Sequence, residues 1–441
     1  MRLKTFKQGI HPKYFKELSS KEPIKKCPFP KRVVIPLSQH TGAPCKPLVE
    51  KKDKVERGQK IGKADGFISA PVHSPVTGTV KSIDKQPFPR FKSLDAIVIE
   101  RDEKSEGKEW KKGILDLEKI SPDEIRKKVR EAGIVGLGGA AFPASVKISP
   151  PKEKPIDTII LNGCECEPYL TADHRIMLEY PDDCILGLKI IMKTVGAKKG
   201  IVGIEVNKMD AYNLFCGKTK DEENIDVELV QVKYPEGAEK MLIKAILSRE
   251  VPAGGLPMDV GVVVHNVGTA VSITEAIRDD KPLIERVVTV TGKGINNPGN
   301  FLVLIGTPFS DVIEAAGGMK DNAAKIIMGG PLMGITQSTL DVPVVKGTSG
   351  ILVLTEDETD IEEEVNCIRC ARCVDHCPMY LIPTEFVKLV KGEAWERLNS
   401  YHLMDCIECG CCAFVCPSKI PIVQYVNVGK LALVNIKSKK G

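Results

Sequence analysis

Two copies of one four-cysteine pattern near the C-terminal end constrain the fold of this chain more than any other feature of its sequence. They read Cys367-x2-Cys370-x2-Cys373-x3-Cys377-Pro378 and Cys406-x2-Cys409-x2-Cys412-x3-Cys416-Pro417. This spacing is typical of cubane 4Fe-4S clusters, in which one copy supplies three thiolates and the other copy supplies the fourth. The first predicted cluster therefore takes Cys367, Cys370, Cys373 and Cys416, and the second takes Cys406, Cys409, Cys412 and Cys377. A chain with two such clusters carries electrons.

A pair of structural zinc sites is the alternative interpretation of these cysteines. Zinc sites normally combine two cysteines with two further ligands at longer range, which is not the pattern seen in either copy. Cys411 lies inside the second copy but does not fit the spacing. We expect it to be a small buried side chain without a ligand role.

The composition indicates a soluble protein with several domains. At 441 residues the chain exceeds what one hydrophobic core usually serves. Eight of its fifteen cysteines belong to the cluster pattern, and the others form no disulfide framework, which favours a reducing cytosol. We expect no secretory signal and no direct membrane span, because the apolar runs are short. The net charge of +5 is mild and mixed along the chain, so nucleic-acid binding is not expected.

The N-terminal region alternates short β-branched runs with turn residues between Val33 and Glu100. This pattern predicts a small all-β unit. Its segments, including Ala70 to Val80, resemble the barrel-sandwich hammerhead of biotinyl and lipoyl carrier domains. The tip of the tight turn, Ser74 to Gly78, lacks the lysine that carries the cofactor in those domains. We therefore expect a structural or docking role here, with His73 as a loop residue.

The central region alternates apolar strands with helical stretches from Gly133 to about Asp280. Such alternation predicts an α/β domain with a largely parallel sheet. A helix should begin just after Ser121 and run to Ala132, because Ser121 has the features of an N-cap residue. The charged stretch from Arg101 to Lys119 suits a linker.

The complete chain is thus expected to be a multidomain α/β and α+β protein. An N-terminal all-β barrel-sandwich hybrid precedes the α/β domain, a β-grasp unit follows it, and a helical ferredoxin-like domain with two cubanes ends the fold. The expected boundaries are 1–105, 120–280, 281–325 for the β-grasp unit, 326–357 for a connecting segment, 358–425 for the ferredoxin-like domain and 426–441 for a basic tail.

A glycine-rich turn follows the first helix of the α/β domain, from Gly136 to Lys147. Glycines let a backbone approach a phosphate closely, and a nearby lysine adds positive charge. The turn matches neither the dinucleotide fingerprint nor the P-loop. A glycine turn that only allows close packing is the alternative interpretation.

Three further loops follow apolar strands and carry polar side chains. They begin at Asn162, Tyr234 and His265. The carboxyl ends of strands in open α/β sheets are the usual place for ligands, so four loops could converge on one pocket.

Together these four segments resemble the flavin and nicotinamide site of the NADH-binding subunit of respiratory complex I. With the hammerhead, a β-grasp unit of the SLBB type and the double-cubane ending in this order, the chain is similar to the RnfC subunits of the Rnf complexes, which are membrane-bound ferredoxin:NAD oxidoreductases. The resemblance implies FMN, NAD(H) and two 4Fe-4S clusters as cofactors. It also implies the cofactor-binding residues Gly136, Gly138, Gly139 and Lys147 for the FMN phosphate and ribityl chain, Asn162, Glu165, Asn266 and Thr269 for the flavin ring, and Phe142 and Glu167 for the nicotinamide nucleotide, with Tyr234 in the third loop.

Three residues depart from the complex I pattern. Cys164 replaces a flavin-binding aspartate, Ala238 replaces a glutamate implicated in NADH recognition, and Gly268 replaces another glutamate. The NAD contacts are therefore expected to differ from those of complex I. Glu167 would accept hydrogen bonds from a ribose and repel a 2′-phosphate, which favours NAD over NADP. Its alternative role is an ion pair with a neighbouring base such as Arg175.

The resemblance implies an oxidoreductase subunit without a classical acid or base, in which FMN connects NAD(H) to the clusters. Its implied partners are integral membrane and flavin subunits and a ferredoxin-type iron-sulfur subunit, and its implied location is peripheral, on the cytoplasmic side of the bacterial inner membrane. Two alternatives stay open. They are an NADH-dependent cobalamin reductase of a bacterial microcompartment and a non-catalytic iron-sulfur relay scaffold.

Overall fold

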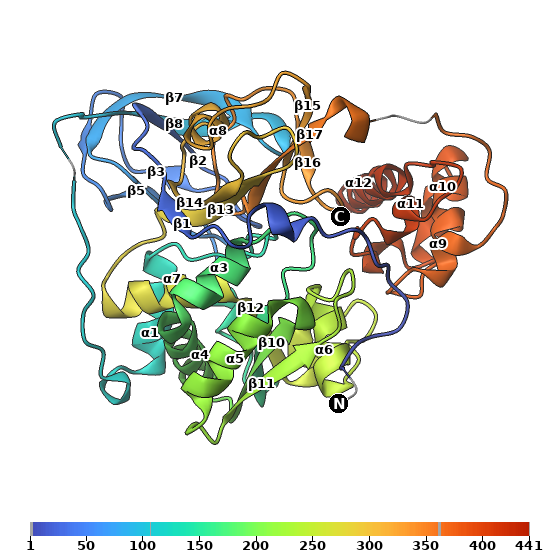
Figure 1. Ribbon diagram of the computed structural model, residues 1–441, viewed down its shortest axis with the longest axis horizontal. Helices are drawn as coiled ribbons and strands as arrows, with labels where there is room; N and C mark the ends of the chain where they lie inside the picture. The colour runs from blue at the N-terminus through green and yellow to red at the C-terminus, as the bar shows by residue number, and fades with distance from the viewer. Residues whose placement is uncertain (1–2, 106, 360–362, 441) are drawn as a thin grey trace.

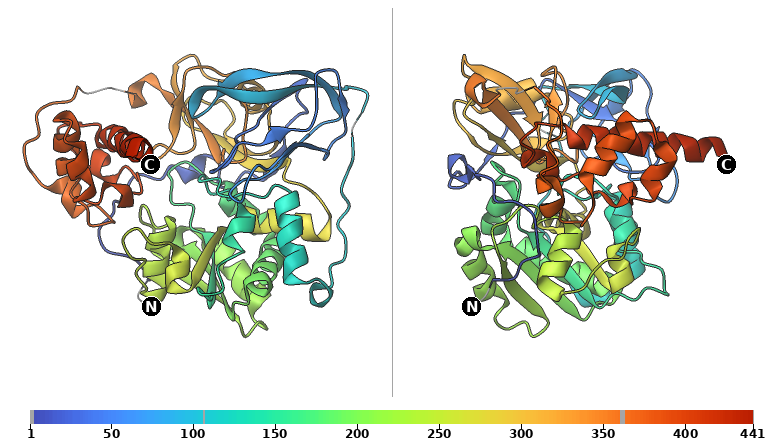
Figure 2. Two further views of the ribbon diagram at one scale, coloured as in Figure 1. Left: turned by 180° about the vertical axis from the view of Figure 1, so that it is seen from behind. Right: turned by 90° about the vertical axis from the view of Figure 1, so that its right-hand side faces the viewer.

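The computed structural model of the chain describes residues 3–105, 107–359 and 363–440. Figure 1 shows an α/β domain below, two β units above it, and a small helical domain at one side that contains the C-terminus. The views from behind and from the side in Figure 2 show the same arrangement. Among the described residues, every helix is too short or too polar to cross a lipid bilayer.

A four-stranded parallel sheet with the strand order β11-β10-β9-β12 forms the centre of the α/β domain. Ile159 and Leu161 belong to one hydrophobic core with residues of α4 and α7, whereas Ile160 belongs to a second core with residues of α6. Both faces of the sheet are covered, so the strands are runs of apolar residues. The strands are β9 (Thr158–Gly163), β10 (Lys199–Glu205), β11 (Ile225–Val230) and β12 (Val262–Asn266).

The helices of this domain confirm the local signals in the sequence. Ser121 caps the first helix in a capping box with Glu124, and the helix ends at Glu131, with Ala132 as its C-cap. The helices are α1 (Pro122–Glu131), α2 (Ala144–Lys147), α3 (Ala172–Glu179), α4 (Pro181–Val195), α5 (Met209–Thr219), α6 (Glu239–Leu247) and α7 (Val267–Arg278).

The N-terminal β unit consists of two small antiparallel sheets with the orders β2-β8-β7-β4 and β3-β5-β6. Val33, Ile61, Val72 and Ile97 are buried in its core. The strands are β2 (Arg32–Pro36), β3 (Lys46–Pro47), β4 (Lys54–Val55), β5 (Lys60–Lys63), β6 (Val72–His73), β7 (Gly78–Phe88) and β8 (Phe91–Arg101).

A six-stranded mixed sheet with the order β1-β14-β13-β17-β15-β16 forms the second β unit. The expected connecting segment, 326–357, is part of this sheet, because Ile351 and Val353 bury their side chains in the same core as Phe309 of α8. The elements are β13 (Glu285–Thr291), β14 (Gly299–Leu304), α8 (Phe309–Ala315), β15 (Ala323–Met328), β16 (Ile335–Gln337) and β17 (Gly350–Thr355).

Residues 4–26 pair with strands and loops outside the two small sheets of the N-terminal β unit. Lys4 bridges to Val230 and Ile10 bridges to Tyr234, both in the α/β domain. Strand β1 (Ile24–Lys26) then pairs with β14 in the six-stranded sheet. Phe6 and Ile10 are buried by this course, which explains why the segment crosses between domains.

The C-terminal helical domain packs its helices around the cysteine loops. The last helix includes residues 426–440 of the expected basic tail, whose last residue lies outside the described residues, and Val426 and Leu433 are buried in the same core as Phe386. The α-helices are α9 (Arg372–Asp375), α10 (Pro383–Lys391), α11 (Cys411–Phe414) and α12 (Ile422–Lys440). Short 3-10 helices occur across the chain at η1 (Lys16–Leu18), η2 (Leu117–Lys119), η3 (Val206–Lys208), η4 (Pro257–Val260), η5 (Glu356–Glu358), η6 (Trp395–Asn399) and η7 (Leu403–Asp405).

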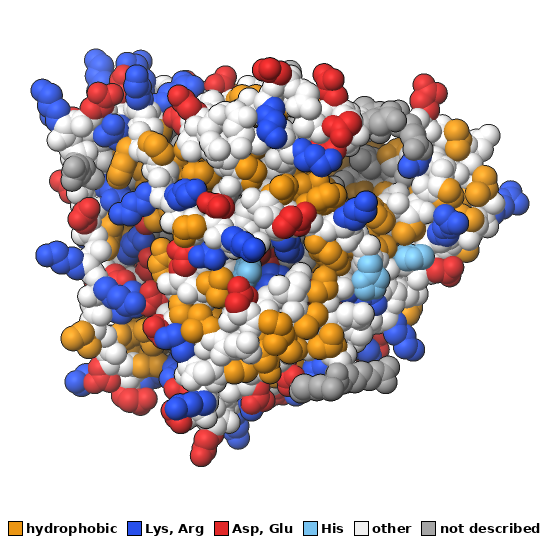
Figure 3. Space-filling view, viewed as in Figure 1, with side chains coloured by type: hydrophobic (Ala, Val, Ile, Leu, Met, Phe, Trp, Pro, Cys, Tyr) orange, Lys and Arg blue, Asp and Glu red, His pale blue; other side chains and the backbone are white. Residues whose placement is uncertain are grey.

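Charged side chains of both signs are mixed over the face shown in Figure 3. This distribution agrees with the mild net charge of the sequence.

Candidate functional site

The strand order of the α/β sheet changes direction between β9 and β12. From β9 the chain adds β10 and β11 on one side and then returns to add β12 on the other. Loops that leave such a switch point in opposite directions form the usual ligand crevice of open α/β sheets. Asn162 and Asn266 are paired in register at this point.

The predicted glycine turn lies over this crevice. The Gly136 amide donates to the Phe142 carbonyl at 2.9 Å and closes the turn. A Cβ atom on Gly138 would lie 3.5 Å from the Asn266 Cβ, and one on Gly139 would meet no atom within 4 Å. Gly139 also has a φ of +109°, which other residues rarely adopt. The turn therefore leaves open space over the crevice, which fits a group that the backbone must approach closely.

Thr269 fixes the turn to the start of α7. Its hydroxyl accepts a hydrogen bond from the Leu137 amide at 2.9 Å, and its side chain is buried. The structure thus brings Thr269 to the predicted site, with a hydroxyl oxygen that already has a backbone partner.

The two asparagines of the crevice hold its loops together. The Asn162 side chain donates to the Gly237 carbonyl at 2.8 Å and so joins the loops after β9 and β11. The Asn266 side chain donates to the Asp173 carboxylate at 2.6 Å and accepts from the Gly268 amide.

Glu165 caps the third helix. Its carboxylate accepts hydrogen bonds from the amides of Asp173 at 2.7 Å and His174 at 3.2 Å. A carboxylate at a helix N-terminus is favoured by the helix dipole. The backbone of Glu165 has a φ of +49°, so the loop turns sharply at this residue.

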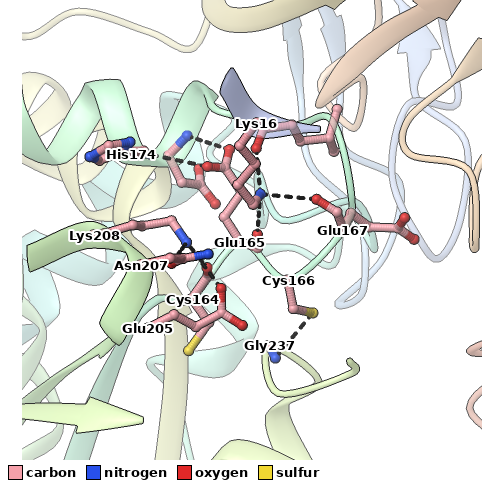
Figure 4. Close-up of polar contacts among 12 residues, drawn as sticks. Lys16, Cys164, Glu165, Cys166, Glu167, His174, Glu205, Asn207, Lys208 and Gly237 are labelled. Carbon is pink, nitrogen blue, oxygen red and sulfur yellow. Dashed lines mark hydrogen bonds and ion pairs between the residues drawn. The ribbon is translucent and has the colours of Figure 1, made fainter. Parts of the chain in front are cut away.

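Lys16 of the N-terminal segment holds the same loop from the other side. Its buried ammonium donates to the carbonyls of Glu165 at 2.7 Å, Glu167 at 3.0 Å and Leu170 at 2.6 Å. Figure 4 shows its Nζ lying between the backbones of Glu165 and Glu167. Burial lowers the pKa of Lys16. Sequence reasoning missed this residue, because a single lysine in a basic N-terminal segment has no distinguishing pattern.

Glu167 faces the C-terminal half of the molecule. Its carboxylate accepts from the amides of Leu332 at 3.2 Å and Met333 at 2.8 Å, and it lies 3.4 Å from the Tyr234 hydroxyl oxygen. Burial raises the pKa of Glu167 to about 7. Arg175, the expected ion-pair partner, pairs instead with Glu179 at 2.7 Å. The structure therefore does not form the ion pair between Glu167 and Arg175 that was one of the two sequence hypotheses.

Lys147 is the last residue of α2, and Phe142 lies in the turn before this helix. The Lys147 ammonium forms an ion pair with Glu239 at 2.8 Å and donates to the Val264 carbonyl at 2.6 Å. Phe142 is half-buried. A lysine whose charge is already paired contributes less positive potential to a phosphate.

Tyr234 connects the α/β domain to the cysteine loops. The side chain is fully buried, and its hydroxyl donates to the Cys409 carbonyl at 2.8 Å. Tyr234, Cys166, Cys409 and Cys411 form one buried cluster with Ile10. The loop after β11 therefore contacts a predicted cluster ligand directly.

Four cysteines of the second predicted cluster line one cavity. Its walls include Phe386 and Val426 with Cys377, Cys406, Cys409 and Cys412, and Cys411 lines the same cavity. Burial raises the pKa of Cys406 to about 11, with a contribution from the charges of Cys409 and Cys377. The arrangement places Cys377 from the first copy among three cysteines of the second, which fits the crossed ligand set.

The structure also brings Cys373 of the first copy near Cys416 of the second. Burial raises the pKa of Cys373, and the charges of Cys416 and Cys367 contribute to the increase. Cys367 and Cys370 are exposed. Among the described residues, no three Cys, His, Asp or Glu side chains converge as ligands of a single metal ion.

Cys411 is fully buried, as predicted. Its thiol lies 3.9 Å from the Tyr234 carbonyl, outside the cysteine spacing of both clusters.

Four family models match the chain, in the predicted order. They are the RnfC barrel sandwich hybrid domain at residues 4–104, the Nuo51 FMN-binding domain at 129–275, the SLBB domain at 287–336 and the 4Fe-4S dicluster domain at 366–420. These matches confirm the predicted fold class. They also confirm FMN and two 4Fe-4S clusters as cofactors, so the zinc alternative is wrong.

Curated relatives are similar over almost the whole chain. One subunit of the proton-translocating ferredoxin:NAD(+) oxidoreductase complex of Clostridium ljungdahlii is 47% identical over 429 residues, which cover 96% of this chain and 93% of that protein. The corresponding subunit of the Na(+)-translocating ferredoxin:NAD(+) oxidoreductase complex of Acetobacterium woodii is 44% identical over 435 residues, which cover 99% of this chain and 98% of that protein. Its counterpart in the ion-translocating oxidoreductase complex of Rhodobacter capsulatus is 40% identical, over 98% of this chain and 84% of that protein.

A solved NAD+-reducing NiFe hydrogenase has a TM-score of 0.49 and 18% identity, over 73% of this chain and 62% of that chain. The identity to the curated relatives, maintained over nearly the whole length, shows that the chain belongs to the RnfC family of subunits of the ion-translocating ferredoxin:NAD(+) oxidoreductase complexes.

Proposed function

We propose that this chain exchanges electrons between NAD(H) and an iron-sulfur chain through FMN. It does so as the peripheral NAD-side subunit of a ferredoxin:NAD(+) oxidoreductase complex coupled to ion transport. The relatives in Clostridium ljungdahlii and Acetobacterium woodii carry this activity in their names.

The hydrogen bond from the Tyr234 hydroxyl to the Cys409 carbonyl is the observation that carries the proposal. It joins a loop at the carboxyl edge of the flavin-type sheet to a ligand of the second cluster. The buried cluster around Tyr234 would then lie between a flavin bound at this edge of the sheet and a cubane held by the cysteine loops. Holding such centres close together is the task of the protein in electron transfer.

The residues around the crevice are proposed to bind FMN. The glycine turn approaches the phosphate and ribityl chain, with Lys147 at its end, and the loops after β9 and β12 line the ring. Phe142 is proposed to lie on the nicotinamide side. Glu167 and Tyr234 are assigned to the wall between the flavin and the second cluster, because their contacts point there. The proposed FMN contacts are Gly136, Gly138, Gly139, Lys147, Asn162, Glu165, Asn266 and Thr269.

The proposed cluster ligands are the two crossed sets of cysteines. Cys377, Cys406, Cys409 and Cys412 hold the second cluster, and their common cavity supports this assignment. The first cluster is assigned to Cys367, Cys370, Cys373 and Cys416.

When bound, FMN supplies the conversion of one hydride from NADH into two single electrons, with net release of one proton. The chain itself binds and positions. Thr269 and Asn266 fix the crevice, Lys16 holds the 165–170 loop, and the buried cluster around Tyr234 excludes water between the two centres.

The same proposal includes partners and location. We infer contacts with integral membrane and flavin subunits and with a ferredoxin-type iron-sulfur subunit, on the cytoplasmic side of the bacterial cell membrane. Membership of a family of complex subunits supports the existence of partners.

Anaerobic titration of the purified chain with NADH tests the proposal. The flavin absorbance should bleach, and EPR signals of two reduced cubanes should follow, with two electrons delivered for each NADH consumed. If the flavin bleaches but no cluster signals appear, the result would support a flavin enzyme without electron transfer to the clusters. If the flavin does not bleach, the result would support the non-catalytic relay scaffold. Addition of a cob(III)alamin acceptor tests the corrin alternative, for which reduction of the corrin should outpace that of a ferredoxin-type acceptor.

A further inference from the structure

Two buried cations lie beneath the glycine turn, and both come from outside the α/β domain. Arg286 is the second residue of β13 and is 5% exposed, and Lys346 precedes β17 and is 1% exposed. Arg286 donates to the Leu137 carbonyl at 3.2 Å and also to the Lys346 carbonyl. Lys346 donates to the carbonyls of Gly133 at 2.7 Å and Pro71 at 2.8 Å. Both cations therefore form hydrogen bonds with the backbone that leads into the turn.

Carbonyl oxygens are the hydrogen-bond partners of these two side chains. Among the described residues, neither cation forms an ion pair, because no carboxylate oxygen lies within 4.0 Å of its nitrogen atoms. Burial lowers the pKa of Lys346 to about 8 and that of Arg286 to about 10. A buried charge is costly unless an opposite charge compensates it.

Asp173 is the acid whose charge acts on Arg286. Burial, with the Glu165 carboxylate as the next cause, raises the pKa of Asp173 to about 7. Its carboxylate also accepts a hydrogen bond from Asn266. Asp173 therefore acts on Arg286 from beyond ion-pair distance, and the direction of its pKa shift weakens that compensation.

The position of these two side chains relative to the turn indicates which group balances their positive charge. Leu137 and Gly133 lie within five residues of Gly138, and a Cβ atom on Gly347 would lie 3.2 Å from the Gly139 carbonyl. Gly138 is exposed over the crevice. The backbone that the two cations bind thus leads directly into the open turn, whereas the charge of Lys147 is paired with Glu239.

We propose that Arg286 and Lys346 are positioning residues for a phosphate group that binds over Gly138 and Gly139. They act through their undercompensated positive charge and through their hydrogen bonds to the backbone that leads into the turn. This inference rests on the proposed function. The phosphate is either the monoester of FMN or the pyrophosphate of NAD(H). In both cases the β units outside the flavin domain supply positive charge in addition to that of Lys147, which is paired with Glu239.

Ligand pairs that differ in phosphate separate this role from a structural one. The flavin-free full chain is titrated with FMN and with riboflavin, and the quenching of flavin fluorescence gives both dissociation constants. In Arg286→Met and Lys346→Met, FMN should bind about tenfold more weakly, while riboflavin binding should change less than about twofold, because a charge acts only on a charged ligand. Arg286→Lys should keep most of the preference for FMN.

Arg278→Met is the matched control. Arg278 is a buried arginine of α7 whose partners are the carboxylates of Asp183 and Asp279. Its loss should lower stability but leave the ratio of FMN to riboflavin affinity unchanged.

The second arm compares NADH with dihydronicotinamide riboside, which lacks the pyrophosphate, as reductants of the FMN-loaded variants. The variants could prefer NADH over dihydronicotinamide riboside less strongly while they still prefer FMN over riboflavin as the unaltered chain does. This result would assign the phosphate to the nucleotide and still support the inference. Equal weakening of FMN and riboflavin, or no change in either preference, would overturn it. NADH could reduce the flavin of the unaltered chain while the variants keep their preferences for FMN over riboflavin and for NADH over dihydronicotinamide riboside. In that case only this inference fails. If NADH does not reduce the flavin of the unaltered chain, the proposed function fails instead.

Discussion

The cysteine cavity and the flavin crevice are built in opposite ways. All eight predicted cluster ligands come from residues 367–416, and a short helical domain brings them together. The crevice takes its glycine turn from the α/β domain, a lysine from the N-terminal segment and two buried cations from the six-stranded β unit and its loops. The comparison teaches that local spacing defines the first site, whereas packing between domains defines the second.

The largest expected effect follows from the local construction of the cysteine cavity. Cys406→Ala should remove the second cluster, so that iron and acid-labile sulfide fall from about eight to about four per chain. FMN should remain, because the crevice does not depend on this thiol. Iron, sulfide and flavin analyses of the reconstituted protein measure this.

Cys411→Ala is the control for that variant. Cys411 is fully buried beside the ligands but outside the spacing. Its loss should keep about eight irons and cost about 1 kcal/mol of stability. Loss of iron equal to that in Cys406→Ala would make the spacing argument wrong.

The next effect concerns the glycine turn. Gly138→Val should abolish FMN binding, because the new side chain fills the space over Asn266, while both clusters remain. Its Cβ would meet the Asn266 Cβ at an ordinary 3.5 Å, so the fold should survive. Flavin content and circular dichroism of the purified variant measure the two outcomes. Gly217→Val in α5, where a Cβ meets nothing within 4 Å, should keep its flavin. Full FMN occupancy in Gly138→Val would show that the turn serves packing alone.

A smaller effect is expected where the N-terminal segment reaches the crevice. Lys16→Met leaves three buried carbonyls without their donor and should lower the free energy of unfolding by about 2 to 4 kcal/mol. FMN should bind more weakly, because the 165–170 loop is released. Denaturant titration with flavin fluorescence measures both. Lys21→Met, an exposed lysine of the same segment, should change neither. Equal behaviour of the two variants would mean that the segment does not organise the crevice.

The smallest effect is expected at Glu167. Glu167→Gln replaces one acceptor oxygen by a donor beside the amides of Leu332 and Met333, which should cost about 1 to 2 kcal/mol. The ratio of flavin reduction rates with NADH and NADPH should not change, because the carboxylate is turned to the cluster side. A clear loss of discrimination against NADPH would restore the ribose role that the sequence motif suggests.

Local signals explain which parts of the structure could be predicted. The Ser121 cap, the apolar runs of the sheet and the cysteine spacing are all short-range patterns, and the structure shows each element where they indicate it. Lys16, Arg286 and Lys346 show no such pattern, because their roles depend on carbonyls more than a hundred residues away. For the same reason the course of the N-terminal segment and the strands within 326–357 could not be predicted. Their apolar residues are buried only when distant strands provide the other half of the sheet.

The most direct test of the account uses its central geometric claim, that the crevice adjoins the second cluster through Tyr234 and Cys409. Rapid-freeze EPR after mixing with NADH follows the clusters in Cys406→Ala and in Cys367→Ala. We predict that the first cluster stays oxidised on the fast timescale when the second is missing, whereas the second is still reduced at its normal rate when the first is missing. Normal reduction of the first cluster in Cys406→Ala would contradict the account.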